Sequence, residues 1–236
     1  MKQQANLKSP IKDVNECLNS IRSCFNPFCP LFSSDSRIVD YFPSRIRFYS
    51  PPSSDEDLHQ HLQSLNSAFR LSQVNYNSAA IIIDGGVKKS HVATAAAHIW
   101  SDNLVIKKLQ VHSINITPLK TEIMAICTGL IPAMKIDNIH DIIVIINSIT
   151  AARKILESKV NLLQNMIIPL ASAIKTFLSK DGRNKIHFWF CPSKAKWPRH
   201  KLVDDQVKAS ICIPTFPSKD SYLFSKKKEC NNILGK

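Results

Sequence analysis

Glycine is scarce in this sequence, and its scarcity narrows the possible chemistry. Only 5 of the 236 residues are glycine, and neither GxxxxGK[ST] nor GxGxxG occurs. Both patterns depend on glycine because the backbone must approach a phosphate closely. No apolar run approaches the roughly 20 residues that cross a bilayer. The sequence therefore argues against a glycine-rich phosphate loop and against a membrane partner.

Cysteine pairs with the spacing of metal ligands are also missing. The seven cysteines are scattered, and no CxxC pair or nearby histidine joins Cys17, Cys24 and Cys29 into a set of four zinc ligands. The first residues, MKQQANLKSPIK, lack the apolar segment of a signal peptide. We therefore expect reduced thiols and an intracellular protein, nuclear or cytoplasmic, that is not secreted.

Positive charge is abundant. There are 31 Lys and Arg against 18 Asp and Glu, which gives a formal net charge of +13 and a pI near 9.5. Such an excess favours a polyanionic partner, nucleic acid first. At 44% hydrophobic residues, the chain can also bury a substantial core.

Patterning divides the chain into three parts. Residues 1–78 are weakly patterned, and we expect a partly disordered extension and linker there, with a short amphipathic helix over 55–71. A compact domain is predicted over 79–212. We expect residues 213–236, which include three consecutive lysines, to form a flexible basic tail.

Hydrophobic periodicity predicts alternating strands and helices in the compact part. AAIIIDGG is apolar on both faces of a strand up to Asp84, which is typical of a central strand. We expect a kink or break at Pro169 in the longest helix. The expected strands cover 79–86, 91–100, 104–112, 141–147 and 185–191, and the expected helices cover 117–134, 148–156, a segment ending near 181, and 201–211. This order predicts an α/β domain with a mixed sheet, antiparallel on one side and parallel on the other.

Polar residues stand at corresponding points of these elements. Asp84 ends the first strand, Glu122 lies early in a helix, Asn147 ends the fourth strand, and Asp204 and Asp205 lie on the last helix. Taken singly, each has an ordinary interpretation: Asp84 begins an Asp-Gly turn, and Glu122 is a solvated acid that complements the helix dipole.

The order of elements and acids resembles the ribonuclease H fold over roughly residues 79–210. ATAAAHIW, TEIMAICTGL, NSITAARKIL and CPSKAKWPRHKLVDD are similar to the ribonuclease H region of fungal LINE-type retroelement polyproteins, and DSRIVDYFPSRIRFY is similar to the segment before it. The resemblance implies a ribonuclease H-like α/β fold with a five-stranded mixed sheet. It also implies a truncated retroelement copy, because no polymerase signature is found.

The same resemblance implies a two-metal endonuclease that hydrolyses the RNA strand of an RNA–DNA hybrid. Asp84 would bridge two Mg²⁺ or Mn²⁺ ions, Glu122 and Asn147 would share one, and Asp204 would hold the other, with His200 assisting product release. The family pattern has Asp where this chain has Asn147. Because an amide offers no charge to hold two cations, we expect catalysis to be strongly reduced or absent.

A basic region that includes aromatic residues follows the last strand. Lys194, Lys196, Trp197 and Arg199 are candidate contacts to nucleic acid, by phosphate pairing and stacking. The alternative is a solvated rim with Trp197 packed on the last helix. Two functions stay open: an impaired hybrid ribonuclease, or a non-catalytic nucleic-acid-binding module, in either case a monomer. A 3′–5′ exonuclease ranks lower, because Asp84 is followed by Gly85 and not by a DxE pair.

Overall fold

The computed structural model describes residues 37–49, 54–88, 92–114, 116–156 and 164–209. They belong to one compact unit that begins at Ser36. Most of the predicted N-terminal extension, with Cys17, Cys24 and Cys29, and the predicted basic tail lie outside the described residues.

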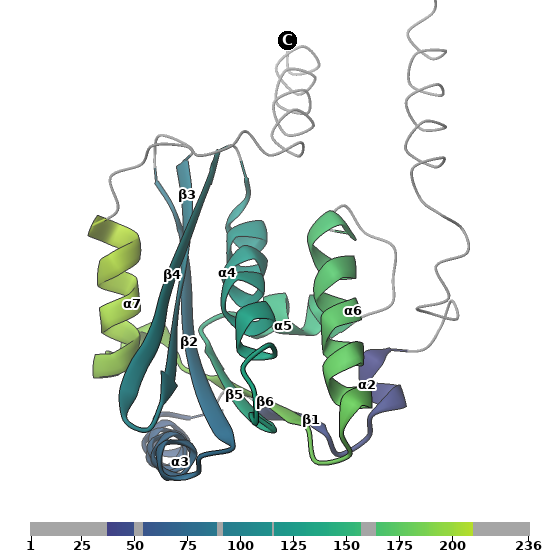
Figure 1. The fold of residues 1–236 in the computed structure, drawn as a ribbon. Coiled ribbons are helices and arrows are strands. Elements are labelled where there is room, and N and C mark those ends of the chain that lie inside the picture. The colour runs from purple at the N-terminus through teal and green to yellow at the C-terminus, as the bar shows by residue number, and fades with distance from the viewer. Residues whose placement is uncertain (1–36, 50–53, 89–91, 115, 157–163, 210–236) are drawn as a thin grey trace, which may run out of the picture. The chain divides into compact units, whose positions relative to one another are not determined.

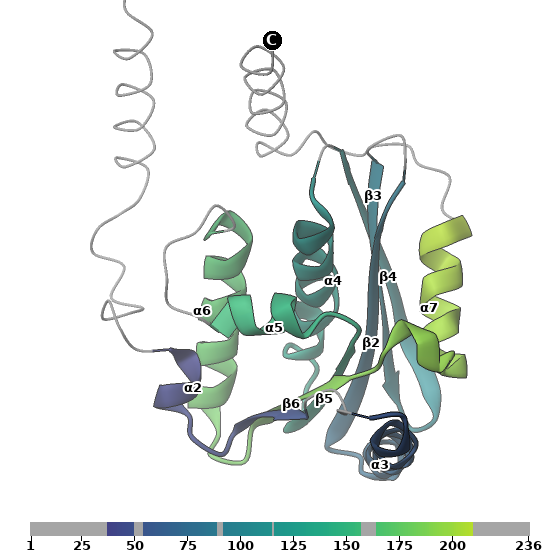
Figure 2. The same ribbon diagram turned by 180° about the vertical axis from the view of Figure 1, so that it is seen from behind.

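The sheet has six strands in the order β1-β6-β5-β2-β3-β4 (Figures 1 and 2). The strands are β1 (Ile46–Tyr49), β2 (Ser78–Val87), β3 (Val92–Ser101), β4 (Leu104–Ile114), β5 (Asp141–Ile146) and β6 (Lys185–Phe190). β3 runs antiparallel to β2 and β4, whereas β5 is parallel to β2 and β6, and β6 is parallel to β1. The predicted mixed sheet is confirmed, with one strand, β1, more than expected.

Helices cover both faces of this sheet. They are α2 (Ile38–Tyr41), α3 (Asp55–Val74), α4 (Pro118–Ala133), α5 (Ile149–Leu156), α6 (Gln164–Lys180) and α7 (Pro198–Ala209), with a 3-10 turn at Ser193–Ala195. In Figures 1 and 2, α7 lies on one side of β2–β4 and α4 on the other, with α5 and α6 on the α4 side. None of the helices in the described ranges is both long and apolar enough to cross a membrane.

β2 is buried on both faces because its alternate side chains enter two different cores. Ile81 and Ile83 meet α4, where an added Cβ at Gly129 would stand 2.6 Å from Ile81 Cγ2. Ile82 belongs to the opposite core with side chains of α3 and α7. An apolar run with no alternation therefore becomes the central strand, as predicted.

Residues before position 79 are part of this domain, which corrects the expected boundary. β1 pairs with β6, and α3 buries Leu65 and Phe69 in the core beneath β2 and α7. Phe69 packs edge-to-face on Trp100 and Trp197. The sequence did not predict β1, because a strand of four residues is too short to show a hydrophobic period.

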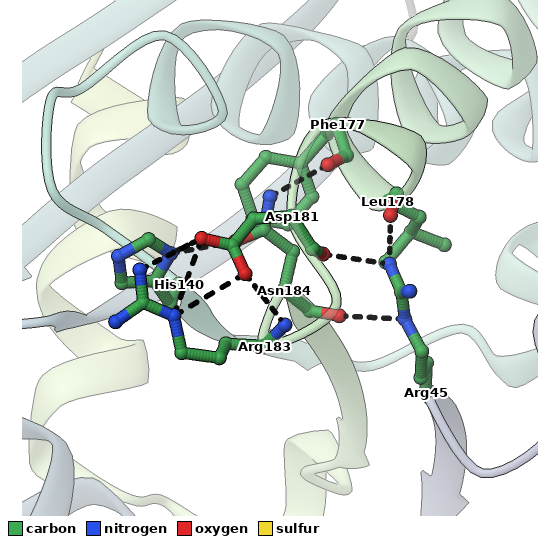
Figure 3. Close-up of polar contacts among 7 residues, drawn as sticks. All are labelled: Arg45, His140, Phe177, Leu178, Asp181, Arg183 and Asn184. Atoms are coloured by element: carbon green, nitrogen blue, oxygen red, sulfur yellow. Dashed lines mark hydrogen bonds and ion pairs between the residues drawn. The ribbon is translucent and has the colours of Figure 1, made fainter.

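A single arginine ties the segment before β1 to the end of α6 (Figure 3). Arg45 donates from Nε to the Asn184 carbonyl at 3.1 Å and from Nη2 to the carbonyls of Leu178 and Asp181. Asn184 in turn donates to the Phe177 carbonyl at 2.6 Å. The last carbonyls of a helix have no intrahelical partner, so Arg45 caps α6 from a position more than 130 residues earlier in the chain.

The helix boundaries differ from the expectation at two places. α6 continues through Pro169, so of the predicted kink or break, a break does not occur. α7 begins at Pro198, three residues before the predicted start, because proline is well tolerated in the first turn of a helix.

Replacement of Phe69 tests whether α3 belongs to the domain. We expect Phe69→Ala to lower the free energy of unfolding by about 3–5 kcal/mol, since the side chain is 1% exposed and leaves a cavity. Leu71→Ala is the matched control on the same helix, because Leu71 is 67% exposed and the cost should stay within about 0.5 kcal/mol. Urea unfolding of both variants measures this, and equal costs would contradict the assignment of α3 to the core.

Candidate carboxylate site

Two glycines allow helices to approach the end of β2 from both faces. A Cβ on Gly85 would stand 2.9 Å from the Thr121 carbonyl oxygen of α4, and a Cβ on Gly86 would stand 2.9 Å from Val207 Cγ1 of α7. Contacts this close exclude any larger residue without a shift of the helix. Asp84, which precedes the pair, is therefore held between α4 and α7 and is only 6% exposed.

The N-terminal part of α4 brings Glu122 beside Asp84. Thr117 caps the helix by accepting a hydrogen bond from the Lys120 amide, and Pro118 starts it. Burial, then the charge of Asp84, raises the pKa of Glu122 to about 8, against a weaker lowering by a hydrogen bond with Asn147. Glu122 is therefore part of the cluster and is not the solvated acid of the ordinary interpretation.

Asn147 follows β5, which is parallel to β2, so both strands present their carboxyl ends at one edge of the sheet. The register pairs Ile82 with Ile145, which brings Asn147 level with Asp84. Asn147 Nδ2 donates to Asp84 Oδ1 at 2.7 Å. The Oδ1 atom of Asn147 is buried and has no hydrogen-bond partner among the residues that the structure describes. The amide thus turns its donors, and not its oxygen, toward the carboxylates.

α7 contributes one aspartate to the cluster and keeps the next one outside. Asp204 lies close enough to Asp84 for its charge to raise the pKa of Asp84, and it forms an ion pair with Lys208 at 2.5 Å. Asp205 instead pairs with Lys201 at 2.7 Å on the exposed side of the helix. The choice of Asp204 over Asp205 therefore agrees with the geometry.

The cluster is electrostatically crowded. Burial, followed by the charge of Asp204, raises the pKa of Asp84 to about 6, although hydrogen bonds from the Gly85 backbone and Asn147 and the charge of Lys208 oppose the shift. Two buried acids with raised pKa values indicate that the protein supplies too little positive charge for full ionisation.

These donors do not fit a pair of divalent cations as they are arranged. An N–H group faces Asp84 where a cation needs an oxygen, and the carboxylate of Asp204 is already paired with Lys208. Among the residues that the structure describes, no group of three or more His, Cys, Asp or Glu side chains is arranged to hold a metal ion. Lys208 lies four residues after Asp204 on the same helix, a spacing that by itself predicts their ion pair.

His200 differs from its expected role. The side chain is 7% exposed, and burial lowers its pKa, against the charge of Asp204 and a hydrogen bond with the Ile83 backbone. A histidine that moves with departing product must reach solvent, whereas His200 packs between α7 and β2. We correct the prediction to a buried residue beside the cluster.

The predicted nucleic-acid contacts fall into different environments. Trp197 is 5% exposed, donates from Nε1 to Asn66 Oδ1 at 2.8 Å and contacts Phe69, so it is a core residue and cannot stack on a base. Arg199 lies over the ring of Phe69 at 4.4 Å. Lys196 is exposed in a left-handed turn, and the side chain of Lys194 lies outside the described part of the chain.

Comparison with known proteins gives a weak structural likeness. No family model matches the chain, and no curated protein matches it in sequence. The chain is similar to the N-terminal RNase H domain of Rv2228c from Mycobacterium tuberculosis, with 17% identity, a TM-score of 0.41, and coverage of 56% of this chain and 94% of that one. LC11-RNase H1 from a compost metagenome, in complex with an RNA/DNA hybrid, is 16% identical with a TM-score of 0.40, and the match covers 56% of this chain and 97% of that one. RNase H1 from Halobacterium salinarum is 12% identical with a TM-score of 0.40, and the match covers 54% of this chain and 98% of that one. Similarities this low carry nothing about activity.

The raised pKa of Glu122 predicts how stability depends on pH. The folded protein holds the Glu122 proton up to about pH 8, whereas the ordinary value is 4.5, so this stabilisation is complete below pH 4.5 and is lost as the pH rises through 8. Glu122→Gln should therefore be as stable as the original chain near pH 4 and more stable, by a few degrees in Tm, at pH 9.

Thermal unfolding in EDTA across this range measures the effect. Asp205→Asn is the control, because Asp205 is exposed and paired with Lys201, and it should not reproduce the difference. Parallel pH curves for Glu122→Gln and the original chain would contradict the buried, protonated state of Glu122.

Proposed function

We propose that this chain is a ribonuclease H-type nucleic-acid-binding domain whose metal-dependent hydrolysis is strongly weakened by Asn147. The observation that carries the proposal is the hydrogen bond from Asn147 Nδ2 to Asp84 Oδ1 at 2.7 Å. A donor from the protein stands beside the carboxylate that would have to face a cation.

Hydrolysis of a phosphodiester by two metal ions requires that both ions be held together near the scissile phosphate. Carboxylates neutralise such a pair, and an amide does not. Here one of the four positions is Asn147, which bonds to Asp84 as a donor. The missing carboxylate lowers the negative charge available to the ions, so its effect on the rate should be large.

The partner that we propose is an RNA–DNA hybrid, bound by a monomer through phosphate contacts. Support comes from the net charge of +13 and from exposed lysine at the predicted position Lys196. An intracellular site of action and descent from a fungal LINE-type retroelement complete the proposal, on the sequence motifs already quoted.

A second candidate function is favoured by the ion pair at Asp204. The ammonium of Lys208 bonds to the Asp204 carboxylate, and Asn147 bonds to Asp84, so both aspartates have partners without any cation. A binding module with no catalysis at all needs nothing more.

Cleavage of a labelled RNA–DNA hybrid separates the two functions. We expect the original chain to cleave no faster than Asp84→Asn, which lacks the central carboxylate. Asn147→Asp should cleave faster by a factor on the order of 100, the size often lost with one electrostatic partner in an active site. The Asp84→Asn/Asn147→Asp double variant is the control for contaminating nuclease.

The results distinguish impaired catalysis, binding without catalysis, and no nucleic-acid binding. Cleavage by the original chain well above Asp84→Asn would refute the impairment. Hybrid binding without cleavage in any variant would favour the binding module. Failure to bind a hybrid at moderate salt would overturn the nucleic-acid assignment itself.

Metal binding can be measured without catalysis. With Mn²⁺ at about 100 times its Kd, binding to the folded state alone raises the free energy of unfolding by about 2.7 kcal/mol. The Tm of Asn147→Asp should therefore rise by several degrees in Mn²⁺ relative to EDTA. The original chain should show little change. An equal rise in both proteins would mean that Asn147 serves as a ligand through its oxygen.

A further inference from the structure

Four hydrogen bonds link five side chains of β3, β4 and α7 into one relay. His98 Nε2 bonds to Gln206 Oε1 at 2.6 Å, and Gln206 Nε2 donates to Gln110 Oε1 at 2.8 Å. Gln110 Nε2 bonds to His112 Nε2 at 2.9 Å, and His112 Nδ1 bonds to Thr94 Oγ1 at 3.1 Å. Nothing in the carboxylate cluster requires this arrangement.

The relay has a direction, because an amide offers donors at one end and an acceptor at the other. Gln206 Oε1 only accepts, so His98 must carry its hydrogen on Nε2. Gln110 Nε2 only donates, so His112 Nε2 must be bare and its hydrogen must lie on Nδ1. His112 thereby takes the tautomer that a free imidazole side chain adopts less often.

The buried end sets this direction. His98 is 3% exposed, and its Nδ1 has no hydrogen-bond partner within the described part of the chain. Burial lowers the pKa of His98, against the hydrogen bond with Gln206 and together with the charge of Lys108, which favours the neutral ring. A buried N–H group without a partner is costly, which keeps the hydrogen on Nε2, where Gln206 accepts it.

We propose that Gln206 is a positioning residue that fixes α7 against β3 and β4. Through the amides of Gln206 and Gln110, the tautomer of His98 then determines the tautomer of His112. The apolar contacts of α7, from Val203 and Val207, are not directional. Gln206 adds two directional bonds, to two different strands, on the helix that also carries Asp204. Only the importance of Asp204 on this helix rests on the proposed function.

Nitrogen-15 NMR of the histidine side chains, at a pH where both rings are neutral, tests the relay directly because it identifies which ring nitrogen carries the hydrogen. In the full chain we expect His98 with hydrogen on Nε2 and His112 with hydrogen on Nδ1. In Gln206→Leu, Gln110 is free to turn its amide, and His112 should change to the Nε2–H form although Gln206 does not bond to it. Amides of α7 should also exchange roughly tenfold faster, because two hydrogen bonds are lost.

Gln63→Leu is the matched control. Gln63 bonds to another histidine, His59, at 2.9 Å on α3, so this variant should leave His98, His112 and α7 exchange unchanged. An Nε2–H tautomer of His112 in the unaltered chain would overturn the relay, and this result needs no variant. An unchanged His112 in Gln206→Leu would overturn the transmission. Neither measurement depends on nuclease activity.

Discussion

The structure depends on the burial of β2, which has a strand on each side and helices on both faces. Five elements pack directly against this strand. β3 and β5 complete its backbone hydrogen bonds, α4 covers one face, and α3 and α7 cover the other. The carboxylate of Asp84 lies just beyond the part of this strand that pairs with β5, where water is scarce and charge is costly. Asn147 partly offsets this cost by donating a hydrogen bond to Asp84.

Asn147 can be understood in the same terms. Three acids and an amide share a small volume, and the pKa values of Asp84 and Glu122 are raised by burial and by neighbouring charge. A fourth carboxylate would increase the repulsion unless a cation compensated it. An amide relieves it, since it donates a hydrogen bond to Asp84. The substitution thus fits the fold while it removes charge that a metal would need.

Much of this could be predicted from the sequence, and the parts that could not share a physical reason. The run AAIIIDGG identified the central strand, and Thr117-Pro118 identified the start of α4, because their signals are local. β1 was missed because a four-residue strand becomes stable only through its partner β6. For Trp197 the sequence left two environments open, and His200 was placed near solvent only by the resemblance. Trp197, just before α7, and His200, in its first turn, are both buried. Burial depends on which helix face meets the sheet, and composition does not contain that information.

The position of β1 has a consequence for how the protein assembles. β1 precedes β6 by about 140 residues, since Ile46 pairs with Ile186, and β5 and β6 lie between β1 and β2 in the sheet. Contacts of such long range form slowly. On the ribosome, β1 is made before the other strands of this sheet, but its partner β6 is available only after about 140 further residues have been synthesised. The capping of α6 by Arg45 has to wait equally long, so the beginning and the end of the domain close together in one late step.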